Sequence, residues 1–133
     1  MSQENVRRVR ALWAAVNRGD TGSLALFDTD VVYEQDLLPD HIGQTFRGIE
    51  GVVKAWSAWT EAWDQLDTDV EWVRDAGRDA VVSCHRARGR GKRSGVDAAL
   101  RYAYLWRFRE GKVIYCKGFG DPTEALEAAG LSE

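Results

Sequence analysis

The sequence has few cysteines and prolines and no long apolar run. Two cysteines among 133 residues, Cys84 and Cys116, are too few for a disulfide framework, so we expect free thiols in a reducing compartment. Two prolines argue against a long disordered region. The apolar runs are too short to span a membrane, and the N-terminal MSQENVRRVR lacks the apolar segment of a signal peptide. We therefore predict a cytoplasmic protein without membrane partners.

Excess positive charge and metal-ligand motifs are also missing. The net charge of −3 argues against a generic nucleic-acid binder. The two histidines and two cysteines show neither C-x-x-C nor H-x-x-x-H spacing, so we predict no dedicated metal site and no cofactor. The basic segment HRARGRGKRSG (85–95) fits neither the phosphate-loop nor the dinucleotide-binding pattern, and we interpret it as a solvated hairpin.

What the sequence does contain is the pattern of one globular domain over residues 1–133, with 44% hydrophobic and 29% charged residues. Helical spacing of apolar residues predicts a helix that ends near 17–19, a short helix near 24–27 and a helix over 49–64. Alternating β-branched and aromatic residues predict five strands, over 31–35, 68–74, 80–88, 96–109 and 113–119. A tight turn at Glu110-Gly111 joins the last two, and Asp121 with Pro122 begins a terminal helix.

This order of elements predicts an α+β domain. Helices that are segregated from a run of consecutive strands favour a curved antiparallel sheet with the helices on one face. We expect the sheet to wrap around the N-terminal helix and the longer third helix over 49–64.

Four segments carry a family resemblance: NRGD (17–20), FRG (46–48), FREGKV (108–113) and DPTEALEAAGL (121–131). Together they resemble the nuclear-transport-factor-two-like superfamily, and within it the SnoaL-like branch, which includes polyketide cyclases and relatives of ketosteroid isomerase. The resemblance covers nearly the whole chain. It implies a conical α+β barrel that encloses a small-molecule pocket, and a homodimer formed through the outer face of the sheet.

The resemblance also implies positions for catalytic groups, and the sequence departs from the family at each of them. The donor tyrosine of ketosteroid isomerase falls on Leu12, its carboxylate base on Gln35 and its donor aspartate on Tyr104. The acid that cyclases and epoxide hydrolases of the superfamily carry on the last strand falls on Gly118. We therefore expect no steroid isomerisation by the family mechanism.

Large rings alternate along the strand 96–109. Tyr102, Tyr104 and Trp106 share one face because successive strand side chains point to opposite faces. They either form plain core or line a pocket. Small residues on the neighbouring strand, Cys116 and Gly118, favour an open space beside the rings. Tyr104, at a family donor position, is the candidate to hydrogen-bond a substrate carbonyl.

His85 belongs to the strand phase 81, 83, 85 and 87, which we expect to face inward because the other phase carries arginines. A histidine there would titrate near neutral pH and act as a general acid or base. The alternative is a hydrogen-bonded structural histidine. Asp36, at the end of the first strand, is a candidate displaced base, and His41 would join it in a lid; both are otherwise ordinary surface residues.

The remaining candidate ligand-binding residues come from three elements, and each is either core or pocket wall. They are Tyr33 and Gln35 on the inward phase of the first strand, Trp56 and Trp63 in the stripe of the third helix, and Leu12 and Trp13 on the first helix.

These observations favour a protein that binds a small apolar or aromatic carbonyl compound. As an isomerase, cyclase or dehydratase it would use acid–base chemistry, with His85 moving the proton and with Tyr104 and Tyr102 polarising the carbonyl. The alternative is a non-catalytic binding module, or a dimeric accessory module, of the same fold.

Overall fold

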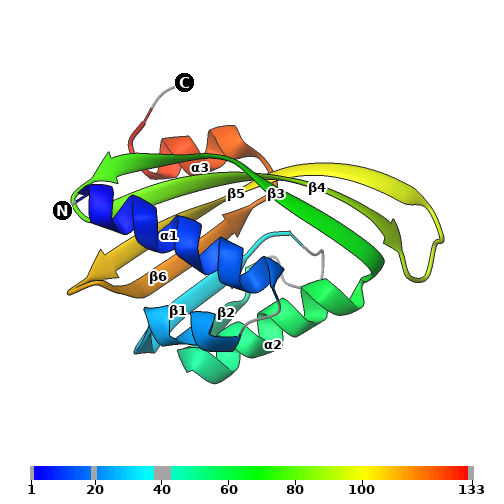
Figure 1. The fold of residues 1–133 in the computed structure, drawn as a ribbon, viewed down its shortest axis with the longest axis horizontal. Coiled ribbons are helices and arrows are strands. Elements are labelled where there is room, and N and C mark those ends of the chain that lie inside the picture. The colour runs from blue at the N-terminus through cyan, green and yellow to red at the C-terminus, as the bar shows by residue number, and fades with distance from the viewer. Residues whose placement is uncertain (1, 19–20, 38–42, 132–133) are drawn as a thin grey trace.

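Six strands form one curved sheet in the order β2-β1-β6-β5-β4-β3 (Figure 1). The computed structural model describes residues 2–18, 21–37 and 43–131. The strands are β1 (Phe27–Gln35), β2 (Thr45–Arg47), β3 (Trp63–Gly77), β4 (Ala80–Gly91), β5 (Asp97–Arg109) and β6 (Lys112–Phe119). The helices are α1 (Ser2–Asn17), the 3-10 helix η1 (Thr21–Leu26), α2 (Gly48–Glu61) and α3 (Pro122–Ala128). In these ranges no helix has the length and apolar character to cross a bilayer.

The expected α+β class is confirmed, but one strand pairing differs from the antiparallel expectation. β1 pairs with β6 in parallel, with Tyr33 opposite Cys116 and Gln35 opposite Gly118. The other neighbouring strands are antiparallel. β2 and β3 lie at the two edges, so the curved sheet is open rather than a closed barrel.

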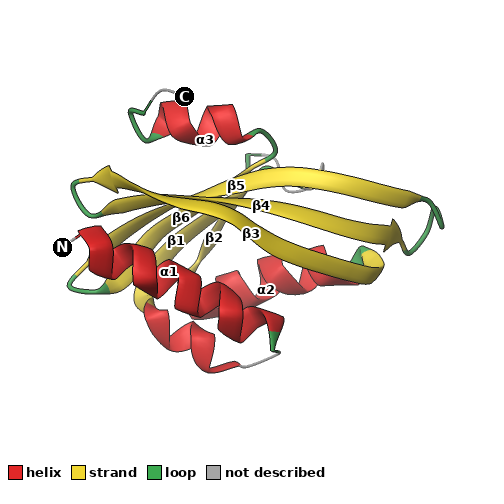
Figure 2. Cartoon of the chain, turned by 45° about the horizontal axis from the view of Figure 1, so that its top comes forward, coloured by secondary structure: helices red, strands yellow, loops and turns green. Residues whose placement is uncertain are grey.

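Helices cover both faces of the sheet, which corrects the prediction that all of them lie on one face. α1 and α2 cover the inner, concave face, and α3 lies across the outer face (Figure 2). The reason is the apolar side of α3, where Ala125 and Leu126 are buried against Val82 and Leu105 of the outward strand phase. A helix this short is stabilised by such packing rather than by its own propensity.

The α2–β3 boundary also differs from the prediction. α2 ends at Glu61, and Trp63 begins β3 opposite Gly91 instead of completing the helical stripe. α2 therefore has 14 residues against 16 in α1, so it is not the longer helix. The backbone N–H of Lys92 donates to the carbonyl of Ala62 at 3.0 Å, so pairing with the β4–β5 hairpin begins directly after the helix.

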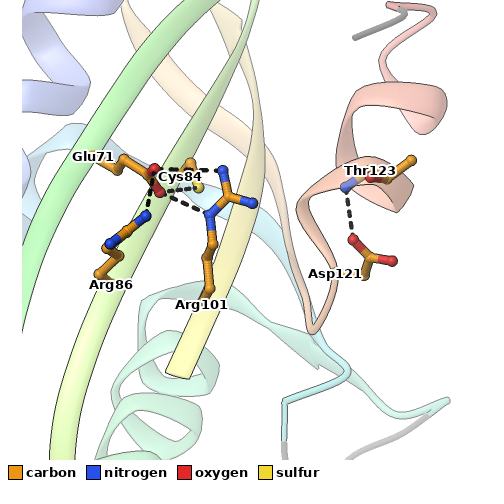
Figure 3. A network of polar contacts seen from close by, with 6 residues as sticks. All are labelled: Glu71, Cys84, Arg86, Arg101, Asp121 and Thr123. Atoms are coloured by element: carbon orange, nitrogen blue, oxygen red, sulfur yellow. Dashed lines mark hydrogen bonds and ion pairs between the residues drawn. The ribbon is translucent and has the colours of Figure 1, made fainter. Parts of the chain in front are cut away.

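Local turn and cap signals give the predicted structures. Glu110 and Gly111 both have positive φ, 51° and 79°, as a two-residue hairpin of type I′ requires. The Asp121 carboxylate caps α3 by accepting the backbone N–H of Thr123 at 2.9 Å (Figure 3). These short-range features depend on neighbouring residues alone, so the sequence pattern suffices to place them.

A charged cluster on the outer face centres on Glu71 (Figure 3). Its carboxylate accepts from Arg101 Nε at 2.8 Å, lies 3.3 Å from an Arg86 guanidinium nitrogen and accepts from the Cys84 thiol at 3.3 Å. These donors, Arg101 first, lower the pKa of Glu71 to about 2. Burial, reinforced by the Glu71 carboxylate, raises the pKa of Cys84 to about 11, so this thiol stays protonated and unreactive at neutral pH.

We expect Leu126→Ala to destabilise the protein by about 3 kcal/mol, because it leaves a cavity between α3 and the outer face. Glu127→Ala, on the exposed side of α3, is the matched control and should change the unfolding free energy by less than about 0.5 kcal/mol. Urea unfolding at one fixed protein concentration measures both. Equal, small effects of the two substitutions would show that α3 is not docked on the sheet.

Candidate functional site

Aromatic rings from six elements meet on the inner face of the sheet. The expected inward phases agree with the burial of Tyr33, His85, Tyr102, Tyr104 and Trp106, each at most 3% exposed. Neighbouring rings lie in contact, from Trp13 on His85 at 4.1 Å between centroids to Tyr33 near Trp56 at 6.5 Å. We call this ring cluster the inner aromatic site. It is formed by Trp13 of α1, Trp56 and Trp59 of α2, Tyr33 of β1, Trp63 of β3, His85 of β4, and Tyr102, Tyr104 and Trp106 of β5.

One hydrogen-bond network in this site centres on Tyr33. Its hydroxyl accepts from Trp56 Nε1 at 2.8 Å and donates to Gln35 Oε1 at 3.1 Å, and Gln35 Nε2 donates to the carbonyl of Ala55 at 3.5 Å. The ring of Tyr104 lies 6.3 Å from that of Tyr33 between centroids. Burial raises the pKa of both tyrosines well above its ordinary value, so both stay neutral. Gln35 and Tyr33 are thus engaged with protein groups.

A second network holds His85. Trp106 Nε1 donates to Ser83 Oγ at 2.8 Å, and Ser83 Oγ lies 2.8 Å from His85 Nε2. The imidazole also contacts Trp13 and stacks on Tyr102, 5.4 Å away at an angle of 27°. Sequence reasoning placed Ser83 on the inward face but gave it no role. The available signal was its position two residues before His85, which puts both side chains on one face of a strand.

Three buried nitrogen atoms have no hydrogen-bond partner within the part of the chain that the structure describes. They are Trp13 Nε1, Trp63 Nε1 and His85 Nδ1. Leaving a buried polar group unpaired costs about 1–3 kcal/mol, so native proteins rarely do so without a reason. Trp13 and His85 are in ring contact, which brings two unpaired polar atoms into the same small region.

His85 does not titrate as expected. Burial lowers its pKa to about 3, because the charged imidazolium is disfavoured away from water. The prediction of a histidine that titrates near neutral pH is therefore wrong for the chain without ligand. At pH 7 the ring is neutral.

The open space expected beside Gly118 is occupied by Tyr104. A Cβ atom placed on Gly118 would lie 2.9 Å from Tyr104 Cε1 and 3.3 Å from Leu37 Cδ1. The glycine therefore admits a flat ring against β6, and a tyrosine covers the position at which the resemblance would place an acid. This corrects the expectation of free volume at this point.

Asp36 does not join the inner aromatic site. Its carboxylate lies 3.5 Å from Lys117 Nζ, and this ammonium group contacts the ring of Phe119 on the outer face. The structure thus directs Asp36 toward the outer face, away from His85, which argues against its expected role as displaced base. His41 lies outside the described residues.

The other predicted binding residues have apolar surroundings. Leu12 is buried in the inner core, and Cys116 is fully buried with the pKa of its thiol raised by desolvation. Trp63 packs its ring against Trp59 at 5.6 Å and over Gly89, where a Cβ atom would lie 2.8 Å from Trp63 Cε3. Trp63 is therefore an inward residue of β3 rather than part of the helical stripe.

The inner aromatic site offers neutral hydrogen-bond donors and no buried carboxylate. Among the described residues, the buried polar side chains are Asn5, Gln35, Ser83 and His85. In the same set, no three His, Cys, Asp or Glu side chains lie together in a metal-binding arrangement. The chemistry this permits is hydrogen-bond donation to an oxygen acceptor within an apolar enclosure.

Comparison with known families agrees with this geometry. The sequence profile of the SnoaL-like domain matches residues 9–116, most of the chain, and the protein belongs to the SnoaL-like family. No curated protein sequence matches the chain significantly.

Solved structures show the same fold. An NTF2-like protein of unknown function from Burkholderia pseudomallei has a TM-score of 0.78 at 22% identity, with 96% of this chain and 97% of that chain covered. An NTF2-like protein from Burkholderia thailandensis has a TM-score of 0.78 at 24% identity, covering 95% and 96%. A protein with a ketosteroid isomerase-like fold from Catenulispora acidiphila, in complex with trimethylamine, has a TM-score of 0.66 at 25% identity, covering 92% of each chain.

We expect Gly118→Ala to destabilise the protein by about 1–3 kcal/mol, because the new methyl group overlaps a Tyr104 ring that its neighbours hold in place. Gly120→Ala is the matched control on the same strand end, since its Cβ would meet nothing closer than 3.9 Å. Chemical denaturation measures both variants. A cost for Gly118→Ala no greater than that for Gly120→Ala would show that the Tyr104 ring does not lie against Gly118.

We also expect stability to fall as the pH is lowered through the range 6.5 to 5. The unfolded chain protonates His85 below about pH 6.5, whereas the native chain resists protonation down to about pH 3. The unfolded state then binds more protons, so the unfolding free energy decreases toward a slope of about 1.4 kcal/mol per pH unit. The stabilising contribution of Glu71 is lost only as the pH falls from its ordinary pKa of 4.5 toward its native pKa of about 2, which lies below this range.

His85→Gln keeps a polar side chain beside Ser83 but cannot titrate, so it is the reference for this measurement. Unfolding free energies of both proteins at pH 7, 6 and 5 give the two slopes. The contribution of every other group cancels in their difference. Parallel slopes would contradict a buried, neutral His85.

Proposed function

We propose that the protein binds a small apolar or aromatic carbonyl compound in the inner aromatic site, on the side formed by α1, β4 and β5. The observation that carries this proposal is the pair of unpaired nitrogen atoms on contacting rings, Trp13 Nε1 and His85 Nδ1. An indole N–H always donates, so the complementary group on a ligand is an acceptor oxygen.

The surroundings of this pair support an apolar or aromatic ligand. Ligand sites are mostly apolar, with a few polar groups that fix orientation. Here the rings of Tyr104 and Trp106 lie beside Trp13, and the ring of Tyr102 stacks on His85. The fold relative in complex with trimethylamine supports the idea that this architecture serves small organic ligands.

Binding is favoured over acid–base catalysis. An isomerase, cyclase or dehydratase needs a group that takes up a proton at neutral pH, ideally with a pKa near the working pH. Within the described residues no carboxylate is buried, and His85 has a pKa of about 3. We therefore place the non-catalytic binding function first. Catalysis on the same carbonyl ligand is second, because His85 Nδ1 has no protein partner in the described chain.

We also propose that a second copy of the chain docks on the outer face, in the cytoplasm. α3 covers one part of this face, and β3, β4 and β5 extend beyond it (Figure 2). Opposite charges alternate on the uncovered part, where Asp69 faces Arg86 across the strands and Arg90 lies 3.1 Å from Asp97. A face with both signs of charge is suited to pairing with its own copy.

We expect 1-indanone to bind and Trp13→Phe to weaken the binding about five-fold, because the phenyl ring keeps the apolar contact and removes one N–H donor. Trp72→Phe, on the outer face, is the control and should leave the affinity unchanged. Isothermal titration calorimetry measures the affinities. Native mass spectrometry of the same samples gives the number of subunits and any retained molecule. Absence of binding, or equal affinities for wild type and Trp13→Phe, would overturn the proposal.

Deuterium uptake at C2 of 1-indanone in D2O separates binding from catalysis. A catalyst that polarises the carbonyl and removes the neighbouring proton accelerates this exchange. We expect no acceleration above the protein-free rate. Acceleration that disappears in His85→Gln would establish the catalytic alternative.

A further inference from the structure

We propose that Ser83 is a positioning residue that fixes His85 as the tautomer with its proton on Nδ1, and that the site thereby selects ligands with an acceptor oxygen and rejects ligands that bring a donor. This inference deepens the proposed function and rests on it for the identity of the site.

The indole nitrogen of Trp106 has a proton and no lone pair to offer. In its contact with Ser83 Oγ at 2.8 Å, the serine oxygen is therefore the acceptor. The serine hydroxyl still has its own proton to donate. The acceptor within reach in the described structure is His85 Nε2, also at 2.8 Å. Nε2 must then be unprotonated, and the proton of the neutral ring lies on Nδ1.

The opposite tautomer leaves a group unpaired. A proton on Nε2 would donate to Ser83 Oγ, which already accepts from Trp106, and the serine proton would have no acceptor in the described chain. Ser83, His85 and Trp106 are all 0% exposed, so bulk water does not reach this side of the ring. Satisfying buried donors favours the arrangement in which Ser83 donates.

The second ring nitrogen of His85, Nδ1, determines which ligand group the site can pair with. Nδ1–H has no partner among the described residues, and neither has Nε1–H of Trp13, whose ring lies 4.1 Å from His85. Each of these donors is complementary to an acceptor oxygen on a ligand, as in a carbonyl, carboxylate or phenolate group. The same proton removes the lone pair that His85 would need to act as a base toward the ligand.

The first experiment reads the tautomer directly. Long-range 1H–15N correlation spectra of 15N-histidine-labelled protein at pH 7 distinguish a protonated from an unprotonated ring nitrogen. We expect His85 to show Nδ1 protonated in the wild type. In Ser83→Ala we expect a loss of this preference, and in Ser83→Thr, which keeps the hydroxyl, a return of it. A wild-type spectrum with Nε2 protonated overturns the proposal, as does an unchanged tautomer in folded Ser83→Ala.

Trp106→Phe provides a second route if Ser83→Ala does not fold. It removes the donor to Ser83 and leaves the hydroxyl in place, so Ser83 becomes free to accept from Nε2. We expect a mixture of tautomers. Retention of the pure Nδ1–H form would contradict the proposal that the Trp106 hydrogen bond makes Ser83 donate to His85.

The second experiment compares three bicyclic probes of similar size by calorimetry: 1-indanone with an acceptor, indane with neither group and indole with a donor. We expect 1-indanone to bind at least about five-fold more tightly than the other two, a factor typical of one net hydrogen bond. Tighter binding of indole than of indane would indicate a free lone pair on Nδ1 and overturn the proposal.

The two experiments test the ligand site and the role of Ser83 separately. Failure of all three probes with Nδ1 protonated would reject the proposed ligand site and keep the role of Ser83. Binding of 1-indanone with Nε2 protonated would keep the site and reject the role of Ser83.

Discussion

Exclusion of water from the inner face of the sheet is the constraint on which the rest of the structure depends. The curved sheet, α1 and α2 enclose a layer of aromatic rings that leaves no solvent for their polar atoms. Each tyrosine hydroxyl, indole N–H and imidazole nitrogen must then be matched by another protein group or remain unpaired. The hydrogen bonds that connect Trp106, Ser83 and His85, and those of the Tyr33 hydroxyl, provide such matches. The low pKa of His85 has the same origin.

The inner and outer faces place the same residue type, cysteine, in different surroundings. Cys84 and Cys116 are both buried, yet Cys116 lies among apolar groups, whereas Cys84 donates to a carboxylate that two arginines also contact. Charge on the outer face is thus neutralised by ion pairs with access to water, while the inner face avoids charge altogether. The two proposed binding regions follow this division, because a neutral enclosure suits uncharged donors and the charged face suits contact with a second copy of the chain.

Features that depend on short stretches were predictable from the sequence, and features that depend on distant partners were not. The two-residue period of β4 was enough to place His85 inside, and the hairpin at Glu110-Gly111 follows from local backbone preference. By contrast, the parallel pairing of β1 with β6 has no local signature. Gly118 has no side chain, and this suggested free space beside it. No sequence pattern shows that the Tyr104 ring packs against this glycine. Likewise, the pKa of His85 depends on how completely its neighbours exclude water, which composition does not reveal.

The parallel pairing of β1 with β6 also affects when β1 can fold into the sheet during synthesis. Tyr115 of β6 hydrogen-bonds to Glu34 of β1 across 81 residues of sequence, and β6 lies between β1 and β5 in the sheet. During synthesis β1 emerges early but has only the short β2 beside it until β6 has been made. Contacts that span most of a sequence form late and slowly. The buried side of β1 therefore stays uncovered until β6 has been synthesised. During this interval molecular chaperones can protect the exposed strand from aggregation.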